Sequence, residues 1–423
     1  MNKKFSLAKK IFIAMILGCL FGILFNYLKE KYSIDGFAKI FLDGFVKTVG
    51  QAFTNLIKAM VMPLVFVSIS LGVASIGNLK KLSRVGSKIF LFYVTTTIIA
   101  VSLAIFLTKF IDPANNFHMK NNINLTQQIN NNQEAKKINF ANMILESVPT
   151  NPIQSFVKEN MLQIIFLSIL LGMAITLLQE KSDLIKKILE QANEINLKII
   201  NMIMQLAPIG VFCLITYTFS NFGFAMISSM AKYIFVFYLA LVFQAIIIYS
   251  LMLKLFTRLS IKKFWQKFWP VASVAFSTAS SNASLPVSIK AANNMGISEN
   301  ISSFALSLGA TINMNGTSIM HGITVVFLAH IYNINLSLPD LIKVVFISTF
   351  ASIGTAGVPG VGMLMMAMVL ESINIPAESL AIVLGIDRIL DAGRTVVNVM
   401  GDSICTLIVA DLEKELDRKK FNS

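Results

Sequence analysis

A stripe of polar side chains runs along the last long apolar segment of the chain. Its members recur every three or four residues, a spacing that places them on one face of an α-helix: Asp387, Asp391, Thr395, Asn398 and Asp402. Arg394 follows Asp391 by three residues. An unpaired charge at the bilayer centre costs at least about 2.5 to 3.5 kcal/mol, so this stripe must face the protein interior or a cavity. It is therefore a candidate binding surface.

Arg394 and Asp391 together have the chemistry to recognise an acidic amino acid. A guanidinium offers a planar pair of donors to a carboxylate, and a nearby aspartate accepts from an ammonium group. A plain dicarboxylate would leave Asp391 unpaired and a neutral amino acid would leave Arg394 unpaired, and both are costly in a dry site. The simpler interpretation is that the two side chains only neutralise each other.

Polar or glycine-rich breaks elsewhere in the chain favour the interpretation of this pair as a binding site. The stretch "ASIGTAGVPGVGM" (351–363) lies between two apolar runs, and "STASSNASLP" (277–286) lies between two others. Irregular backbone survives in hydrocarbon only where it is buried in protein or lines a cavity. The apolar arms on either side are about a dozen residues long and reach roughly 18 Å, short of a hydrocarbon core of about 30 Å. Each break is therefore predicted to be the tip of a re-entrant helical hairpin.

A helix interrupted by polar residues follows each hairpin, at 309–322 and at 387–402. The order of hairpin and broken helix thus occurs twice, which is an internal repeat. Matched interruptions in two halves of a transporter point to a binding site near the middle of the membrane.

Composition places these segments in a polytopic membrane protein. Hydrophobic residues make up 55% of the chain, charged residues 14%, and the mean hydropathy is +0.70. The net charge of +14 comes from short basic clusters between apolar segments, with no nucleic-acid motif, so we expect no nucleic-acid partner. Cys19, Cys213 and Cys405 lack metal spacing, and we expect neither disulfides nor structural zinc.

Six membrane-spanning helices are predicted before the first hairpin. The first begins after a lysine-rich start that is typical of signal peptides, but its apolar run continues past Cys19 to Leu28, long enough to span. The others are expected near 48–77, 88–110, 158–179, 197–219 and 229–256. Lysine and arginine gather after the second, fourth and sixth helices, which places those loops and the N-terminus in the cytoplasm. The loops at 220–228 and 111–150 are expected outside.

Other classes fit less well. The sequence has no HExxH, GxSxG or P-loop motif, and no second acidic cluster that would complete a metal site with Asp387 and Asp391, so an intramembrane enzyme is not expected. Re-entrant hairpins also build passive channels, but an Asp–Arg pair indicates a substrate that is held.

Four motifs in order, "STASSNASLP", "NMNGT", "SIGTAGVPG" and "DAGRTVVNVMGD", resemble the hairpin tips and the seventh and eighth helices of the dicarboxylate/amino acid:cation symporter family, the glutamate transporters. The resemblance implies an all-α homotrimer with eight transmembrane helices and two re-entrant hairpins per chain, in a bacterial cell membrane, with both termini cytoplasmic. A transport domain (about 81–111 and 226–416) would slide like an elevator past a scaffold (about 1–80 and 140–225). The implied activity is uptake of glutamate or aspartate with sodium and protons, with no prosthetic group; carriage of C4-dicarboxylates or of a broader range of amino acids is the alternative.

The resemblance also implies roles for individual residues. Arg394 would hold the substrate's side-chain carboxylate and Asp391 its amino group. The pocket would be completed by Ser281, Thr317, Val358, Gly362, Thr395 and Asn398. One sodium site would use Gly309, Asn313, Asn398 and Asp402. A second would use Thr311, Ser352, Ile353 and Thr355. A third would use Tyr93, Thr96, Thr97, Asn313 and Asn315.

The chain departs from the family pattern at three places. Asn315 replaces the aspartate of the usual NMDGT motif, so the third cation site lacks its carboxylate and should bind a cation more weakly. The arginine that many relatives keep at one of two places is absent, with Ala279 and Ala392 there instead, and Arg388 is a possible substitute. His321 stands where proton-coupled relatives have a glutamate, which makes it a candidate proton carrier; a neutral histidine packed between helices is the alternative.

Overall fold

The computed structural model describes residues 7–32, 39–76, 83–114, 148–158, 160–222, 225–355, 357, 360–376, 379–384 and 386–423. Within these ranges the chain is helical apart from turns and one antiparallel bridge between Ile297 and Leu416. The basic loop expected after the second helix and most of the Asn-rich loop fall on 77–82 and 115–147, outside the described residues.

Long apolar helices open the chain. They are α1 (Leu7–Tyr32), α3 (Lys47–Ile76), which the π-helix η1 (Lys39–Val46) precedes, and α4 (Ser83–Ile111). α1 continues without a break past Cys19. By length and composition, four described helical stretches could cross a membrane: Val85–Ile111, Gln163–Gln205, Ser228–Thr257 and Ile389–Leu412. The fold is thus all-helical, as predicted.

The segment between residues 152 and 222 differs from the prediction of two helices joined by a loop. After the short α7 (Pro152–Val157) come α8 (Met161–Leu178), a 3₁₀ turn, η2 (Gln179–Ser182), and then α9 (Asp183–Gln205) and α10 (Ala207–Phe222). The basic stretch expected as a loop is helical because α9 buries Leu189, Asn196 and Ile200 on one face and packs on α3. Pro208 suits the first turn of a new helix, so the chain breaks at Leu206 instead of continuing.

The sixth predicted helix is continuous over three labelled pieces. α11 (Ala225–Phe243) passes through the π-helix η3 (Gln244–Tyr249) into α12 (Ser250–Thr257). A π-helical turn shifts the register of the side chains that follow it, and such turns are frequent at functional sites.

Two pairs of neighbouring helices stand where hairpins were predicted. The first pair is α13 (Ile261–Thr278) and α14 (Ser281–Asn294), and the second is α17 (Leu338–Gly354) and α18 (Val361–Glu371). The members of each pair contact each other. α13 and α17 are longer than the dozen residues expected, because their polar first turns are helical too; in α17 a capping box between Ser337 and Asp340 stabilises this turn.

The two interrupted helices have different structures. The first is broken at Asn313 and Met314, between α15 (Glu299–Ile312) and α16 (Asn315–Ile331). The second was expected to be interrupted within 387–402, which is wrong: α20 (Asp387–Leu412) is continuous, and the break lies before it, after the short α19 (Leu380–Leu384). Polar side chains on one buried face do not interrupt a helix whose backbone carries no proline. The chain ends in α21 (Arg418–Asn422).

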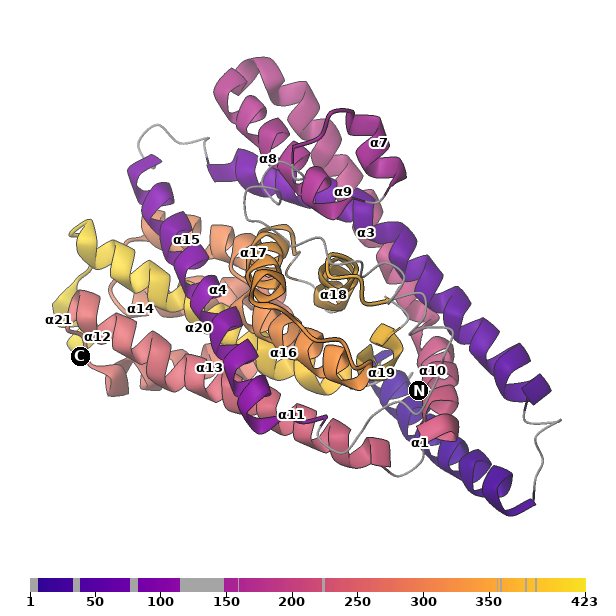
Figure 1. Cartoon of the computed structure of the whole chain (residues 1–423). Helices are drawn as coiled ribbons and strands as arrows, with labels where there is room; N and C mark the ends of the chain where they lie inside the picture. The colour runs from indigo at the N-terminus through magenta and orange to yellow at the C-terminus, as the bar shows by residue number, and fades with distance from the viewer. Residues whose placement is uncertain are drawn as a thin grey trace, which may run out of the picture.

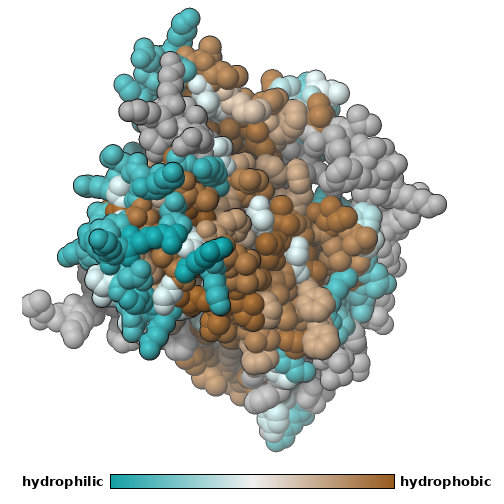
Figure 2. Space-filling view, turned by 90° about the vertical axis from the view of Figure 1, so that its left-hand side faces the viewer, coloured by the Kyte–Doolittle hydropathy of each residue, from teal (hydrophilic) through white to brown (hydrophobic). Residues whose placement is uncertain are grey.

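Figure 1 shows two groups of helices. One contains α1, α3 and α7–α10, and the other contains α4 and the helices from α11 onward. α16 and α20 contact each other inside the second group, where every residue of α16 except His330 is buried. One face of the molecule carries a broad hydrophobic surface with hydrophilic side chains gathered at its borders (Figure 2). A surface of this kind suits a protein surrounded by lipid.

Candidate binding site

The polar stripe of α20 is buried, as its place in an apolar segment predicts. Its five members, Asp387, Asp391, Thr395, Asn398 and Asp402, each expose 9% or less of their surface. They share one face because α20 runs unbroken through all of them. The helix packs against both arms of the first hairpin and against α15 and α16.

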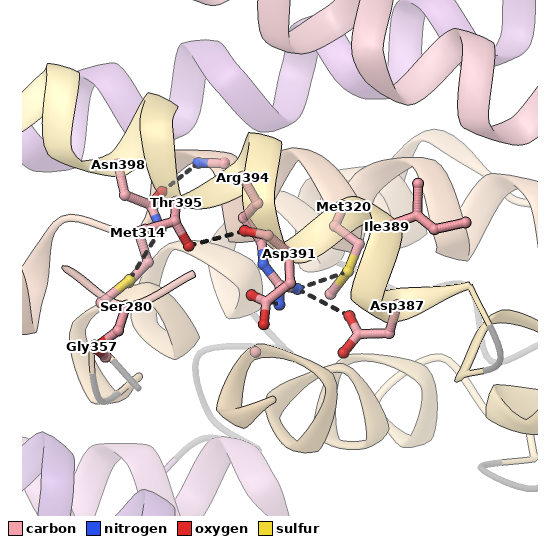
Figure 3. A network of polar contacts seen from close by, with 12 residues as sticks. Ser280, Met314, Met320, Gly357, Asp387, Ile389, Asp391, Arg394, Thr395 and Asn398 are labelled. Atoms are coloured by element: carbon pink, nitrogen blue, oxygen red, sulfur yellow. Dashed lines mark hydrogen bonds and ion pairs between the residues drawn. The ribbon is translucent and has the colours of Figure 1, made fainter. Parts of the chain in front are cut away.

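Arg394 forms ion pairs with two carboxylates of its own helix (Figure 3). Its Nη2 donates to Asp391 Oδ1, and its Nη1 lies 3.4 Å from Asp387 Oδ1. The same Nη1 contacts the thioether sulfur of Met320 on α16 at 2.9 Å. A thioether is a weak acceptor, so the two carboxylates are the strong partners of the guanidinium. In this conformation Asp391 and Arg394 do neutralise each other.

A small cavity lies beside this ion-pair group. Its volume is about 20 Å³, which is room for about one water molecule. Residues from α14, α16, α18 and α20, from the break before α16 and from both hairpin tips line it: Ala279, Ser281, Met314, Thr317, Thr355, Gly357, Gly362, Asp391, Arg394, Thr395 and Asn398. An amino acid needs several times this space, so a substrate can enter only if the hairpins or the Arg394 side chain move.

The tips of the two hairpins are bonded to each other at this cavity. Ser280 Oγ donates to the Gly357 carbonyl at 2.7 Å, and the Asn282 backbone N–H donates to the same oxygen at 3.1 Å. Ser280 also caps the start of α14, since its Oγ accepts from Ala283 N. Ala279 adopts a left-handed conformation with φ of 49°, which turns the chain at the tip. The tips of both hairpins therefore meet at the same cavity.

Most of the predicted substrate-binding residues line this cavity. Ser281, Thr317 and Gly362 do so together with the α20 residues Asp391, Arg394, Thr395 and Asn398. Gly362 lies so close to Arg394 that an added Cβ would stand 2.9 Å from its Nη1. Val358 and the side chain of Arg388 lie outside what the structure describes.

The first predicted sodium set is assembled in one buried place. Asn313 Nδ2 donates to Asp402 Oδ1 at 2.8 Å and to the Asn398 carbonyl at 3.1 Å, and Gly309 lies against the Asp402 carboxylate. Asn313 Oδ1 is buried and has no hydrogen-bond partner among the described residues. An orphaned oxygen beside a buried carboxylate fits a hard monovalent cation.

The second predicted sodium set is brought together only in part. Ser352 Oγ accepts from Met314 N at 2.9 Å and donates to the Ile312 carbonyl at 3.1 Å, so the end of α17 meets the break between α15 and α16. Ile353 and Thr355 are buried, whereas Thr311 is exposed and its hydroxyl donates within its own helix. A cation here would require Thr311 to turn.

In the third predicted set, the residues other than Asn313 form hydrogen bonds with one another or with neighbouring groups. Asn315 Oδ1 accepts from Thr97 Oγ1 at 2.5 Å, and its Nδ2 donates to Thr96 Oγ1 at 2.9 Å and to Tyr249 Oη at 2.8 Å. Tyr93 Oη bonds to the Ala305 carbonyl at 3.3 Å. An amide with all its groups paired offers little to a cation, so these residues do not fit a sodium ion in this arrangement.

His321 is completely buried and bonded to the second hairpin. Its Nε2 lies 3.1 Å from the carbonyl oxygen of Gly362, while its Nδ1 has no partner within the described part of the chain. A neutral imidazole that donates through Nε2 satisfies this carbonyl. Gly362 also lies next to Arg394, so this one residue separates the imidazole ring from the guanidinium group.

Sequence reasoning missed two participants, Met320 and Tyr249. Met320 faces Arg394, and Tyr249 binds Asn315 from the end of η3. Tyr249 could have been found as a lone phenol in the apolar run "AIIIYSLML", because a buried tyrosine hydroxyl needs a partner. Met320 carries no such signal, since methionine is ordinary in apolar helices.

Comparison with known proteins shows which family the sequence matches. Residues 7–412 match the model of the sodium:dicarboxylate symporter family. The chain is 32% identical to the proton/glutamate-aspartate symporter of Escherichia coli (strain K12), over 99% of this chain and 95% of that protein. It is 31% identical to the proton/sodium-glutamate symport protein of Geobacillus stearothermophilus, over 99% and 97%, and 28% identical to the C4-dicarboxylate transport protein of Bacillus subtilis (strain 168), over 98% and 95%. The chain therefore belongs to the sodium:dicarboxylate symporter family and is a cation-coupled membrane transporter, not an enzyme.

Proposed function

We propose that this transporter takes up acidic amino acids, glutamate and aspartate, together with sodium. The observation that carries the proposal is the position of Arg394 between two carboxylates, beside the cavity where the hairpin tips meet. The two relatives at 31% and 32% identity are named for glutamate or aspartate transport. The B. subtilis relative makes C4-dicarboxylates the second candidate.

The second carboxylate explains how Arg394 and Asp391 can both serve a substrate. When Asp391 turns to accept from the substrate's ammonium group, Arg394 keeps Asp387 as a partner. Its guanidinium then has donors free for the substrate's side-chain carboxylate. A dicarboxylate without an amine would satisfy Arg394 but leave Asp391 buried and unpaired, which costs binding free energy.

The charges of the site account for cation coupling. Asp387 and Asp391 with Arg394 carry a net charge of −1 when all three are ionised, and Asp402 adds a further buried carboxylate. An acidic amino acid brings another net negative charge. Burying this excess is unfavourable unless cations enter with the substrate. The oxygens of Gly309, Asn313, Asn398 and Asp402 would hold one sodium ion, and Thr311, Ser352, Ile353 and Thr355 would hold a second. We propose His321 as the carrier where a proton accompanies them.

The grouping of the helices supports an elevator mechanism. α1, α3 and α7–α10 would form the scaffold, and α4 and the helices from α11 onward would form the transport domain that carries both hairpins. We further propose that both hairpins are re-entrant and belong to inverted repeats. The protein would form a homotrimer in the bacterial cell membrane. The positions of the basic loops would place both termini in the cytoplasm.

Competition binding to the purified protein tests the substrate class. We expect aspartate and glutamate to displace a labelled acidic amino acid at concentrations at least tenfold below those of succinate. Asp391→Asn should remove most of this preference, because the variant no longer has a charge for the amine, while Asp43→Asn at an exposed position of η1 should leave it unchanged. Succinate displacing better than the amino acids from the parent protein would favour the dicarboxylate function instead.

A further inference from the structure

A long groove lies between α4 and α17, on the outside of the second group of helices. It has a volume of about 650 Å³ and an almost wholly apolar lining. On α4 the lining residues extend from Phe90 to Lys109, and on α17 from Leu338 to Ile353. These stretches measure roughly 28 Å and 22 Å along their helices, longer than the roughly 15 Å of hydrocarbon in one leaflet. The groove can therefore hold an extended acyl chain.

The groove is open at the surface of the molecule. Ile98 and Phe106 on α4 expose 43% and 65% of their surfaces, and Ile342 and Phe346 on α17 expose 44% and 43%. Phe110, which follows the groove-lining Lys109 on α4, is 80% exposed. α4 and α17 contact each other, and Figure 1 shows α4 crossing in front of this part of the molecule.

One end of the groove is polar and contains a lysine. Lys109 lines the groove and also a neighbouring recess of about 340 Å³ with a mainly polar lining, to which Asn333 and Asn335 belong. Lys109 has no ion-pair or hydrogen-bond partner among the described residues, whereas Asp112 in the same recess is paired with His330 Nδ1 at 2.9 Å. An apolar groove, the Lys109 ammonium group and a recess with amide side chains thus follow one another.

We propose that this groove binds an anionic phospholipid. One acyl chain would lie between α4 and α17, the phosphate would pair with the Lys109 ammonium group, and the hydroxyls of a glycerol headgroup would bond to Asn333 and Asn335. The order of these features matches the order of parts in such a lipid, and the ammonium group of Lys109 favours an anionic lipid over a zwitterionic one.

One wall of the groove is formed by α17, and the end of this helix reaches the candidate site. Thr349, Phe350 and Ile353 line the groove, while Ser352 on the same turn bonds to Ile312 and Met314. A lipid bound here would contact α17 next to Ser352, and Ile353 itself belongs both to the groove and to the second predicted sodium set.

Tryptophan quenching by brominated lipids tests the proposal without requiring transport. Trp265 and Trp269 are the only tryptophans of the chain. Both are replaced by Phe, and Phe346→Trp is introduced in the groove. A matched reporter, Phe235→Trp, stands at an exposed position of α11. The proteins are reconstituted with mixtures that contain brominated phosphatidylglycerol or brominated phosphatidylcholine.

We expect the groove reporter to show at least a threefold preference for the anionic lipid and the α11 reporter to show none. Lys109→Gln should abolish the preference, and Lys232→Gln, an equal change of charge on α11, should preserve it. Equal quenching by the two lipids, or a preference that survives Lys109→Gln, would overturn the proposal. Quenching of the α11 reporter alone would overturn it too, because it would mean that protein, such as residues 115–147, covers the groove.

Discussion

At the scale of single residues, the charges of Arg394 and its two carboxylate partners determine what the site can accept. The spacing along α20 predicted which side chains share a face, because that follows from helix geometry alone. It could not predict that Arg394 also reaches Asp387 and Met320, because those contacts depend on side-chain rotamers and on where α16 lies. The same holds for Tyr249, which meets Asn315 across two helices.

Arg394→Cys should change the selectivity of the site. Loss of a buried charge-assisted pair costs about 2 to 5 kcal/mol, so the affinity for glutamate or aspartate should fall roughly thirtyfold or more. Serine should bind better than to the parent protein, because Asp391 can still hold its amine and no guanidinium is left without a carboxylate. Competition binding with aspartate, glutamate and serine measures both effects. An unaltered ranking would remove Arg394 from the substrate pocket.

Asn315→Asp should create a third cation site. The new carboxylate would accept from Thr97, Thr96 and Tyr249 and add a buried negative charge that a cation can neutralise. Substrate binding titrated with sodium should show a higher sodium affinity or a larger Hill coefficient. Asn300→Asp, at an exposed position of α15, is the matched control and should change neither. If both variants titrate like the parent protein, the third site is absent.

His321→Gln should separate transport from the proton gradient. Glutamine can donate to the Gly362 carbonyl, so the contact with the second hairpin is kept while the titrating group is lost. Acid outside should stimulate uptake by the parent protein and by His330→Gln, and should not stimulate uptake by His321→Gln. Stimulation that persists in His321→Gln would assign the histidine to packing.

At the scale of helices, the sequence predicts helix ends correctly where one physical effect dominates, and wrongly where two effects compete. The tips of both hairpins were predicted because polar residues interrupt the apolar run in the first, and glycine and proline interrupt it in the second. The basic stretch after α8 was predicted as a loop from its charge, yet amphipathic packing against α3 makes it helical. The stripe in α20 was expected to break the helix, yet the buried partners of its polar groups allow it to continue.

The second hairpin depends on the backbone of Gly360. This residue precedes α18 with φ of 86°, a conformation that costs a residue with a side chain roughly 1 to 2 kcal/mol. Gly360→Ala should therefore weaken substrate binding about 5- to 30-fold by straining the closed tip. Gly44→Ala, where an added Cβ would meet nothing within 4 Å, is the control and should leave the dissociation constant unchanged. Equal affinities in the two variants would contradict a role of the tip in closing the site.

At the scale of the whole molecule, the charge and hydropathy of the chain agree with its family. A net charge of +14 is unusual for a soluble protein of this length, but in a membrane protein basic loops determine which side faces the cytoplasm. The two groups of helices meet where α17 and α18 contact α3, so the second hairpin lies against the proposed scaffold. Movement of one group past the other would carry the buried site with it, because its residues come from α13–α20 alone.

Uptake of labelled aspartate by the purified protein in liposomes tests the central claim most directly, with sodium and proton gradients imposed separately. The account predicts concentrative uptake that requires an inward sodium gradient, collapses when an ionophore dissipates that gradient, and is inhibited by glutamate far more strongly than by succinate. Uptake that is indifferent to sodium, or that succinate inhibits more strongly than glutamate does, would contradict it.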